Sequence, residues 1–256
     1  MKNFITISLC TIAAAFMATS CLDLSKWEGN DPNNADAAAI VTIVDGSYDT
    51  NYYVEFDNGQ KAFVTENKAT NSFTFPSKPE QMRGELRKII YFNYEDKKVD
   101  GYDMAIKILR IDDISTSLLK PITDESISKV IDKYTAPVSI STATFGKNRN
   151  YITLDMFIER SEQDTYKHTV LLTYNKDKTG LHENVYGNST DAESYLWLEL
   201  YHDADYDSAV ITDRIFTTYK LDTEEIGVKD LSNYRGIKIV YKNIDTEISE
   251  IYTINL

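Results

Sequence analysis

An alternation of apolar and polar residues with a period of two runs through most of the chain after residue 38, and it constrains the fold more than any other feature. It is plainest in residues 236–242, where Ile237, Ile239 and Tyr241 share one face of an extended segment and two lysines and a valine take the other. The chain also holds eighteen tyrosines and many isoleucines, threonines and valines, which suit a pleated, half-buried surface. The pattern predicts an all-β protein.

The alternation predicts a series of short strands. They run over residues 39–44, 52–56, 61–65, 85–94, 102–111, 137–144, 151–159, 167–174, 195–201, 214–220, 237–242 and 249–256. Turn-forming residues lie between them: Asp57-Asn58-Gly59 is typical of a hairpin loop, and residues 146–150 predict another. Short strands at this spacing favour barrels and sandwiches.

A break in the alternation divides the predicted strands into two groups. Four apolar residues between Ile127 and Tyr134 have the i, i+3, i+4, i+7 spacing of a two-turn helix, and a proline and a polar stretch precede them. We therefore predict two domains: an OB-like β-barrel over residues 38–122 and a β-sandwich over residues 123–256.

The N-terminus carries an export signal. Residues 1–20 contain Lys2, then an apolar stretch, then the small residues Ala18, Thr19 and Ser20, and this order is typical of a cleaved signal peptide. The apolar stretch, at about 14 residues, is too short to span roughly 30 Å of hydrocarbon comfortably as a permanent helix.

Cys21 follows these small residues directly, in a setting that resembles the lipobox of bacterial lipoproteins. Cys10, the chain's other cysteine, lies within the predicted signal peptide, so no disulfide can form in the mature protein. We predict that Cys21 is lipidated and that residues 21–37 form a flexible linker to a membrane. The alternative is a freely secreted protein, because Ala18 and Ser20 also suit an ordinary signal peptidase.

Acidic residues outnumber basic ones, 40 to 27, which gives a net charge of −13. Without residues 1–20, which hold Lys2 and no acid, the charge is −14. A surface of this sign repels phosphate backbones, so we exclude nucleic acid as a partner. The acids are scattered, as on a solubilising surface, and a cationic protein is a candidate partner.

The histidines form no catalytic motif in the sequence. His182 lacks the second histidine of a zincin helix, because Tyr186 stands four residues later. His168 and His202 each continue an alternating apolar row, so we interpret them as hydrogen-bonded core or edge histidines rather than ligands. A nucleophile elbow and a glycine-rich phosphate loop are also missing.

Asp203, Asp205 and Asp207 have the alternate spacing that begins a calcium loop. Ser208 and Arg214 stand where an EF-hand requires glycine and glutamate. We interpret the three aspartates as a solvated acidic turn, with a metal site as the alternative. We therefore predict no catalytic residue, no metal and no cofactor.

Four segments resemble the NigD-like lipoproteins of Gram-negative anaerobes. They are YDMAIKILRIDDISTSLLKP (102–121), YITLDMF (151–157), KHTVLLTY (167–174) and YLWLELYH (195–202), in the order and approximate spacing of that family. The resemblance implies an N-terminal OB-like domain, a C-terminal β-sandwich, a bacterial envelope location at the outer membrane, and a proposed role in immunity to a bacteriocin. It carries over no functional residues.

We therefore expect a non-enzymatic envelope lipoprotein that binds a protein partner such as a cationic toxin. A surface glycan-binding lipoprotein is the alternative, and it would need aromatic rings exposed on one face. An unusual hydrolase with paired carboxylates is a third hypothesis, and it would need a concave pocket with convergent acids.

Substitution of the predicted lipidation site tests the anchor. We expect Cys21→Ala to move the protein from the membrane fraction to the soluble fraction, because the acyl chains are the proposed attachment. Fractionation followed by immunoblotting measures this change, and continued membrane association of the variant would contradict lipidation at Cys21.

Overall fold

The computed structural model describes residues 21–22, 35–44, 52–69, 86–128, 133–146, 150–162, 167–176, 194–208, 210–228 and 230–256. The chain divides into two compact units, Met1–Ile114 with Gly146–Asn148, and Ser115–Phe145 with Arg149–Leu256. Within the described part of the chain, no helix has the length and hydropathy needed to cross a bilayer. The predicted signal peptide and His182 lie outside the described residues.

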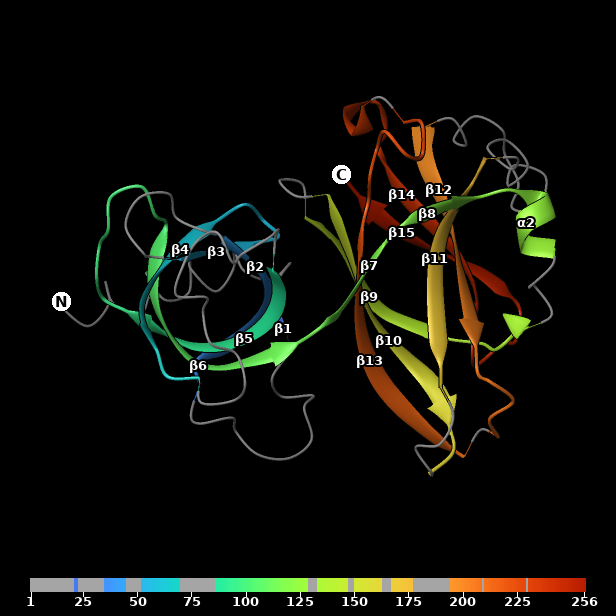
Figure 1. Ribbon diagram of the computed structural model, residues 1–256, viewed down its shortest axis with the longest axis horizontal. Helices are drawn as coiled ribbons and strands as arrows, with labels where there is room; N and C mark the ends of the chain where they lie inside the picture. Colours follow the sequence, from blue (N-terminus) through green and yellow to red (C-terminus); the bar gives the residue numbers. More distant parts are fainter. Residues whose placement is uncertain are drawn as a thin grey trace, which may run out of the picture. The chain divides into compact units, whose positions relative to one another are not determined.

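The first unit is a closed barrel (Figure 1). Its strands are β1 (Cys21–Leu22), β2 (Ala37–Val44), β3 (Tyr53–Phe56), β4 (Lys61–Asn67), β5 (Leu86–Glu95) and β6 (Met104–Asp113). They pair in the order β1-β2-β3-β4-β6-β5, and β5 also pairs with β2, so β2 to β6 close on themselves. Five strands with a single parallel pair, β4 with β6, form the OB-like barrel that the sequence predicts.

Alternation along the barrel strands places every second side chain in its core. In β2, Ala39, Val41 and Ile43 are buried in this way. The predicted hairpin between β3 and β4 is confirmed: Gly59 has φ +86° and its N–H donates to the Phe56 carbonyl at 2.9 Å. Glycine adopts this left-handed backbone conformation without the steric cost that a Cβ would add.

The second unit is a β-sandwich of two sheets. Its elements are β7 (Ser115–Leu118), β8 (Lys120–Ile122), α2 (Asp124–Ser128), β9 (Ser139–Gly146), β10 (Tyr151–Arg160), β11 (Thr169–Asn175), β12 (Tyr195–Asp203), β13 (Ile211–Lys220), the 3-10 helix η6 (Leu231–Asn233), β14 (Gly236–Lys242) and β15 (Ser249–Asn255). One sheet has the order β7-β13-β10-β9, and the other β15-β14-β12-β11-β8. The all-β prediction, a barrel followed by a sandwich, is confirmed.

The division between the units differs from the predicted boundary at residue 122. Residues 115–122 belong to the second unit, because β7 pairs in parallel with β13 and β8 pairs in parallel with β11. Leu119, between these two strands, is fully buried in the sandwich core. The sequence misses β7 because its residues Ser-Thr-Ser-Leu are all exposed and do not alternate.

Two further segments differ from the sequence-based prediction. The predicted helix over 127–134 overlaps α2 only at its start, since α2 ends at Ser128 and residues 129–132 lie outside the described ones. Within the predicted linker, Cys21 and Leu22 pair antiparallel with Ala39 and Ala38 of β2.

The inner faces of the two sheets bury apolar rows against each other. Leu196, Leu198 and Leu200 of β12 form one such row, and Ile237 and Ile239 of the neighbouring β14 extend it. The row on β12 continues to His202, which is only 2% exposed. A polar ring therefore lies at the end of an apolar row.

Truncation of the central leucine tests the role of this row. We expect Leu198→Ala to lower the free energy of unfolding by about 2 to 5 kcal/mol, because it removes buried methyl groups and leaves a cavity. Leu118→Ala, the same change at an exposed leucine of β7, should cost well under about 1 kcal/mol. Urea denaturation measures both, and equal losses would contradict this assignment of the core.

Candidate functional site

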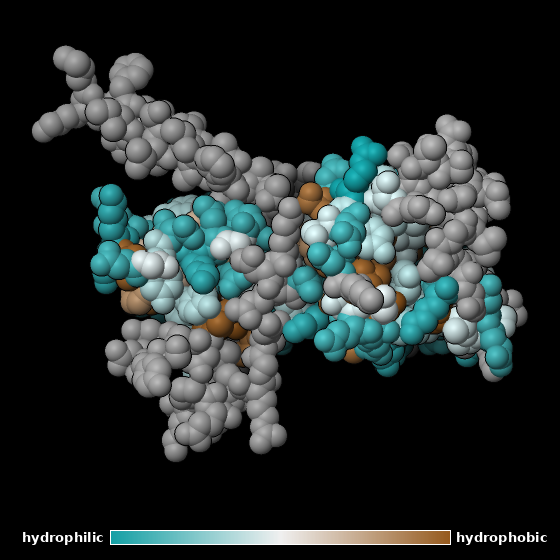
Figure 2. Space-filling model, turned by 90° about the horizontal axis from the view of Figure 1, so that it is seen from above, coloured by the Kyte–Doolittle hydropathy of each residue, from teal (hydrophilic) through white to brown (hydrophobic). Residues whose placement is uncertain are grey.

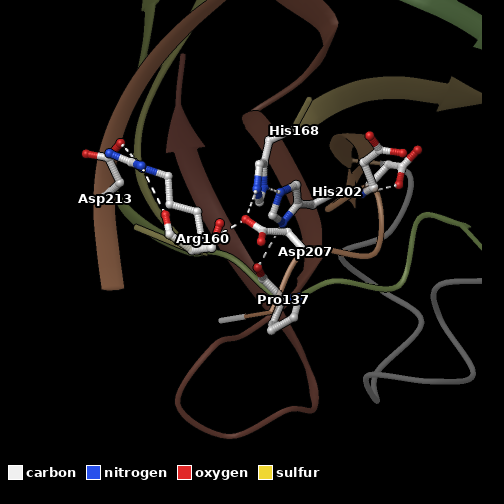
Figure 3. A network of polar contacts seen from close by, with 9 residues as sticks. Pro137, Arg160, His168, His202, Asp207 and Asp213 are labelled. Carbon is white, nitrogen blue, oxygen red and sulfur yellow. Dashed lines mark hydrogen bonds and ion pairs between the residues drawn. The ribbon is translucent and has the colours of Figure 1, made fainter. Parts of the chain in front are cut away.

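Three side chains meet where β11 begins and β12 ends (Figure 3). His168 directly precedes β11, His202 lies near the end of β12, and Asp207 lies in the turn that follows β12. Antiparallel pairing of Val170 with His202 places the start of β11 beside the end of β12. The register between these strands therefore brings the two histidines together.

The three side chains form one continuous chain of polar contacts. His168 Nε2 lies 3.0 Å from Asp207 Oδ2, and His168 Nδ1 lies 2.9 Å from His202 Nε2. His202 Nδ1 lies 3.1 Å from the carbonyl oxygen of Pro137, and the N–H of Ser161 donates to Asp207 Oδ2 at 2.7 Å. The two imidazole rings stack, with centroids 5.1 Å apart.

Burial and hydrogen bonding shift two pKa values in this chain. Burial lowers the pKa of His202, and the neighbouring His168 lowers it further, against the opposing effect of the Pro137 carbonyl. Burial would raise the pKa of Asp207, but the Ser161 N–H and His168 outweigh it and hold the pKa at about 2. His202 is thus favoured as a neutral ring and Asp207 as a carboxylate.

Asp207 anchors a tight turn, which we call the 203–208 turn. Its N–H donates to the Ala204 carbonyl at 2.9 Å, and Asp205 and Tyr206 between them have φ of 51° and 63°. Two left-handed residues with this hydrogen bond form a type I′ turn, in which asparagine, aspartate and glycine are the favoured central residues. Tyrosine at its second central position is strained, and Tyr206 is 89% exposed.

Backbone contacts hold both flanks of this turn. The Ala136 N–H donates to the His202 carbonyl at 3.1 Å, and the Val210 N–H donates to the Arg160 carbonyl at 3.0 Å. Arg160 also pairs with Asp213 through Nε at 2.8 Å, as Figure 3 shows. The exposed tip at Tyr206 therefore projects from a fixed base.

The geometry does not suit a chelated metal. His168 uses one ring nitrogen toward Asp207 and the other toward His202, so the three side chains do not direct lone pairs to one point. Among the described residues, no group of three or more histidine, cysteine and acidic side chains could hold a metal ion. Each nitrogen of both rings has a partner within the protein, so neither is directed toward a substrate.

The structure corrects the interpretation of Asp207 as part of a solvated turn. Its side chain is 2% exposed, whereas Asp205 is exposed and donates its backbone N–H to Asp203 at 2.9 Å. His168 and His202 are hydrogen-bonded within the fold. The alternation in the sequence showed which face of its strand each histidine occupies, but no sequence pattern indicated that the 203–208 turn folds back onto them. For Cys21, the predicted lipidation site, the structure describes the backbone pairing with Ala39 but not the surroundings of the side chain.

A second polar cluster lies on the outer face of β12. Tyr201 donates to Glu199 Oε2 at 2.7 Å, and burial together with Glu199 raises the pKa of the Tyr201 hydroxyl. In the same row, the Lys238 ammonium lies 4.3 Å from the ring centroid of Tyr195 and 5.0 Å from that of Trp197. These rings are already engaged by the protein's own lysine.

Acid titration of stability tests the buried carboxylate. The folded-state pKa of Asp207 is about 2, below its ordinary 3.8, so the ionised group stabilises the fold above about pH 4 and this contribution is lost as pH falls toward 2. We expect Asp207→Ala to be less stable than the wild type at pH 5 and the difference to shrink toward pH 2. Urea midpoints across this range measure it. Asp205→Asn, a control at an exposed acid of the same turn, should show no such convergence.

The second unit matches a known family model, the NigD-like C-terminal beta sandwich domain, over residues 119–256. A search of curated proteins finds no match. Among solved structures, a protein of unknown function from Bacteroides vulgatus is similar at a TM-score of 0.60 and 14% identity, covering 86% of this chain and 90% of the other.

Two further solved structures have the same fold. A NigD-like immunity protein from Bacteroides caccae aligns at a TM-score of 0.53 and 17% identity, covering 84% of this chain and 90% of the other. A candidate lipoprotein from Bacteroides fragilis aligns at 0.54 and 17%, covering 85% and 96%. Because the family model covers more than half of the chain, this protein belongs to the NigD-like family.

Proposed function

We propose that this protein is a non-enzymatic, lipid-anchored envelope protein that binds a cationic protein partner through the 203–208 turn. The observation that carries the proposal is Tyr206, a large aromatic side chain that is 89% exposed on a left-handed backbone. Tyrosine is enriched at protein interfaces, because its ring offers a large contact area and its hydroxyl a hydrogen bond.

Backbone strain at Tyr206 supports a functional role. A left-handed conformation costs a residue with a Cβ roughly 1 to 2 kcal/mol, and glycine would avoid this cost. Buried hydrogen bonds on Asp207, the next residue, hold the strained turn in place. Strain that is retained next to such an anchor is typical of binding and catalytic sites.

Charge supports a cationic partner. Asp203 and Asp205 flank the tip of the turn, and the chain as a whole carries a net charge of −13. On the face drawn in Figure 2, hydrophilic residues predominate on both units. Opposite charges across an interface accelerate association and exclude acidic competitors.

The solved relatives support the location and the biological role. One is named as a candidate lipoprotein and another as a NigD-like immunity protein. With the lipobox-like setting of Cys21, they support attachment to the outer membrane and a role in immunity to a bacteriocin, whose cationic surface would be the partner. The proposed absence of catalysis is supported by the ring nitrogens of His168 and His202, which are all hydrogen-bonded within the protein.

The described aromatic residues favour a protein partner over a glycan. Among the residues that the structure describes, Tyr94 in the first unit and Tyr206 in the second are the exposed aromatic side chains. A sugar-binding platform needs several exposed rings on one face, and the row on β12 is covered by Lys238.

A glycine substitution separates binding from stability. In a strain that lacks this gene and is exposed to a candidate co-encoded bacteriocin, wild-type protein should restore protection and Tyr206→Gly should not. The purified Tyr206→Gly variant should nevertheless be more stable than the wild type, by about 1 kcal/mol, because the strain is relieved. Growth inhibition and urea denaturation are the two measurements.

Two control variants accompany this test. Val210→Ala removes an exposed apolar side chain just outside the turn, and Tyr94→Ala removes the exposed tyrosine of the other unit; both should retain most protection. Full protection by Tyr206→Gly would exclude the 203–208 turn as the contact. Unchanged sensitivity after deletion of the gene would exclude the immunity role.

A further inference from the structure

The polar chain through the two histidines ends in a hydrogen-bond acceptor at both ends. One end is the carboxylate of Asp207 and the other is the carbonyl oxygen of Pro137, and neither can donate a proton. Three contacts, of 3.0, 2.9 and 3.1 Å, connect these acceptors through the four ring nitrogens. Each contact requires one proton, whereas two neutral histidines carry only two.

Two arrangements of three protons satisfy all three contacts, with the cation on one ring or the other, and the burial of His202 favours the arrangement that places the cation on His168. His202 donates from Nδ1 to Pro137, which leaves a lone pair on its Nε2 to accept the Nδ1 proton of His168. His168 must then also carry a proton on Nε2 to donate to Asp207, which makes it an imidazolium. The neutral state that burial favours for His202 agrees with this arrangement.

We propose that His168, His202 and Asp207 form a proton-dependent latch, which holds the 203–208 turn while the histidine pair carries three protons and releases Asp207 when the third is lost. The side chains of His168 and Asp207 are 11% and 2% exposed, so their contact is shielded from water. Asp207 Oδ1 is buried and has no hydrogen-bond partner among the described residues, so the carboxylate is stabilised by the Ser161 contacts and by the cation beside it.

Loss of the third proton removes the cation beside Asp207. A neutral pair satisfies only two of the three contacts: with a proton on His202 Nδ1 a lone pair of His168 faces the carboxylate at 3.0 Å, and with the proton on His168 Nε2 the contact is no longer an ion pair. His202 is held between Pro137 and the core, whereas Asp207 belongs to a turn that contains the strained residue Tyr206. The turn is therefore the part that moves.

Charged groups on the surrounding elements favour the protonated pair. Asp203, at the end of β12, favours the charged form of His202. Arg160 of β10 is paired with Asp213 of β13, and the Lys242 ammonium donates to the carbonyl of Thr135. Other charged residues at the ends of these described segments are Glu162 after β10, Lys133 before β9, Lys167 before β11, Asp205 in the turn, and Asp245 and Glu247 after β14.

The latch adds pH control to the proposed binding site, and this consequence depends on the proposed function. Tyr206 directly precedes Asp207, so release of the carboxylate frees the strained tip. Binding through Tyr206 should therefore be strongest where the pair is protonated and should weaken as pH rises. An ordinary histidine titrates near pH 6.5, within the range that an envelope protein meets.

Hydrogen exchange of the Ser161 amide tests the latch without any partner, so its failure would be distinct from failure of the proposed function. This N–H donates to Asp207, so its protection reports whether the carboxylate is in place. We expect protection to fall by up to about tenfold per pH unit as the pair loses one proton, between about pH 5 and pH 9. Protection at Leu198, in the core strand β12, should stay constant.

Asp207→Asn is the matched variant. The Ser161 N–H and His168 Nε2 contact the same oxygen, Oδ2, so the amide oxygen can take both contacts, and the variant buries no carboxylate charge that needs a cation beside it. We expect the Ser161 amide of this variant to stay protected as pH rises. Protection that is lowered equally at every pH would show a merely structural aspartate and would overturn the latch.

Nitrogen-15 NMR of the histidine rings in the wild-type protein counts the protons directly. We expect three ring N–H groups on the pair at the acidic end of the range and two at the alkaline end, with the change coinciding with the loss of Ser161 protection. Two ring protons throughout, or titration of the rings with unchanged Ser161 protection, would overturn the proposal.

Discussion

The packing of apolar rows between the two sheets of the sandwich is the interaction on which the rest of the second unit depends. The chain has two cysteines, and Cys10 lies in the predicted signal peptide, so we expect the apolar rows rather than a disulfide to supply the stability. Leu198 on β12 and Leu154 on β10 belong to this core and are fully buried. A polar group that continues such a row must find hydrogen-bond partners inside the protein.

His202 meets this requirement, and its hydrogen-bond partners also hold the 203–208 turn at the nearby surface. The ring occupies the next inward position after Leu200, and the partners that it finds, Pro137 and His168, belong to other segments. His168 in turn holds Asp207, so the buried end of an apolar row fixes an exposed turn. One chain of contacts therefore connects the buried His202 with the exposed Tyr206.

The alternation predicted most of the fold because half-buried strands leave a strong local pattern. The rows of β12 and β14 and the hairpin at Gly59 were predicted at the correct positions. Strand β7 was missed because all its side chains are exposed, and pairing with β13 rather than burial makes it a strand. The domain boundary shifted for the same reason.

The sequence by itself determined the strand pattern, the acidic charge and the inward phase of His168 and His202. Tertiary structure decided which of these residues meet. Asp207 looked solvated because sequence spacing describes neighbours along the chain, whereas its partners Ser161 and His168 arrive through strand register and the folding back of the 203–208 turn. Hydrogen-bond partners far apart in sequence are selected by the packing of the sheets, and no local pattern encodes them.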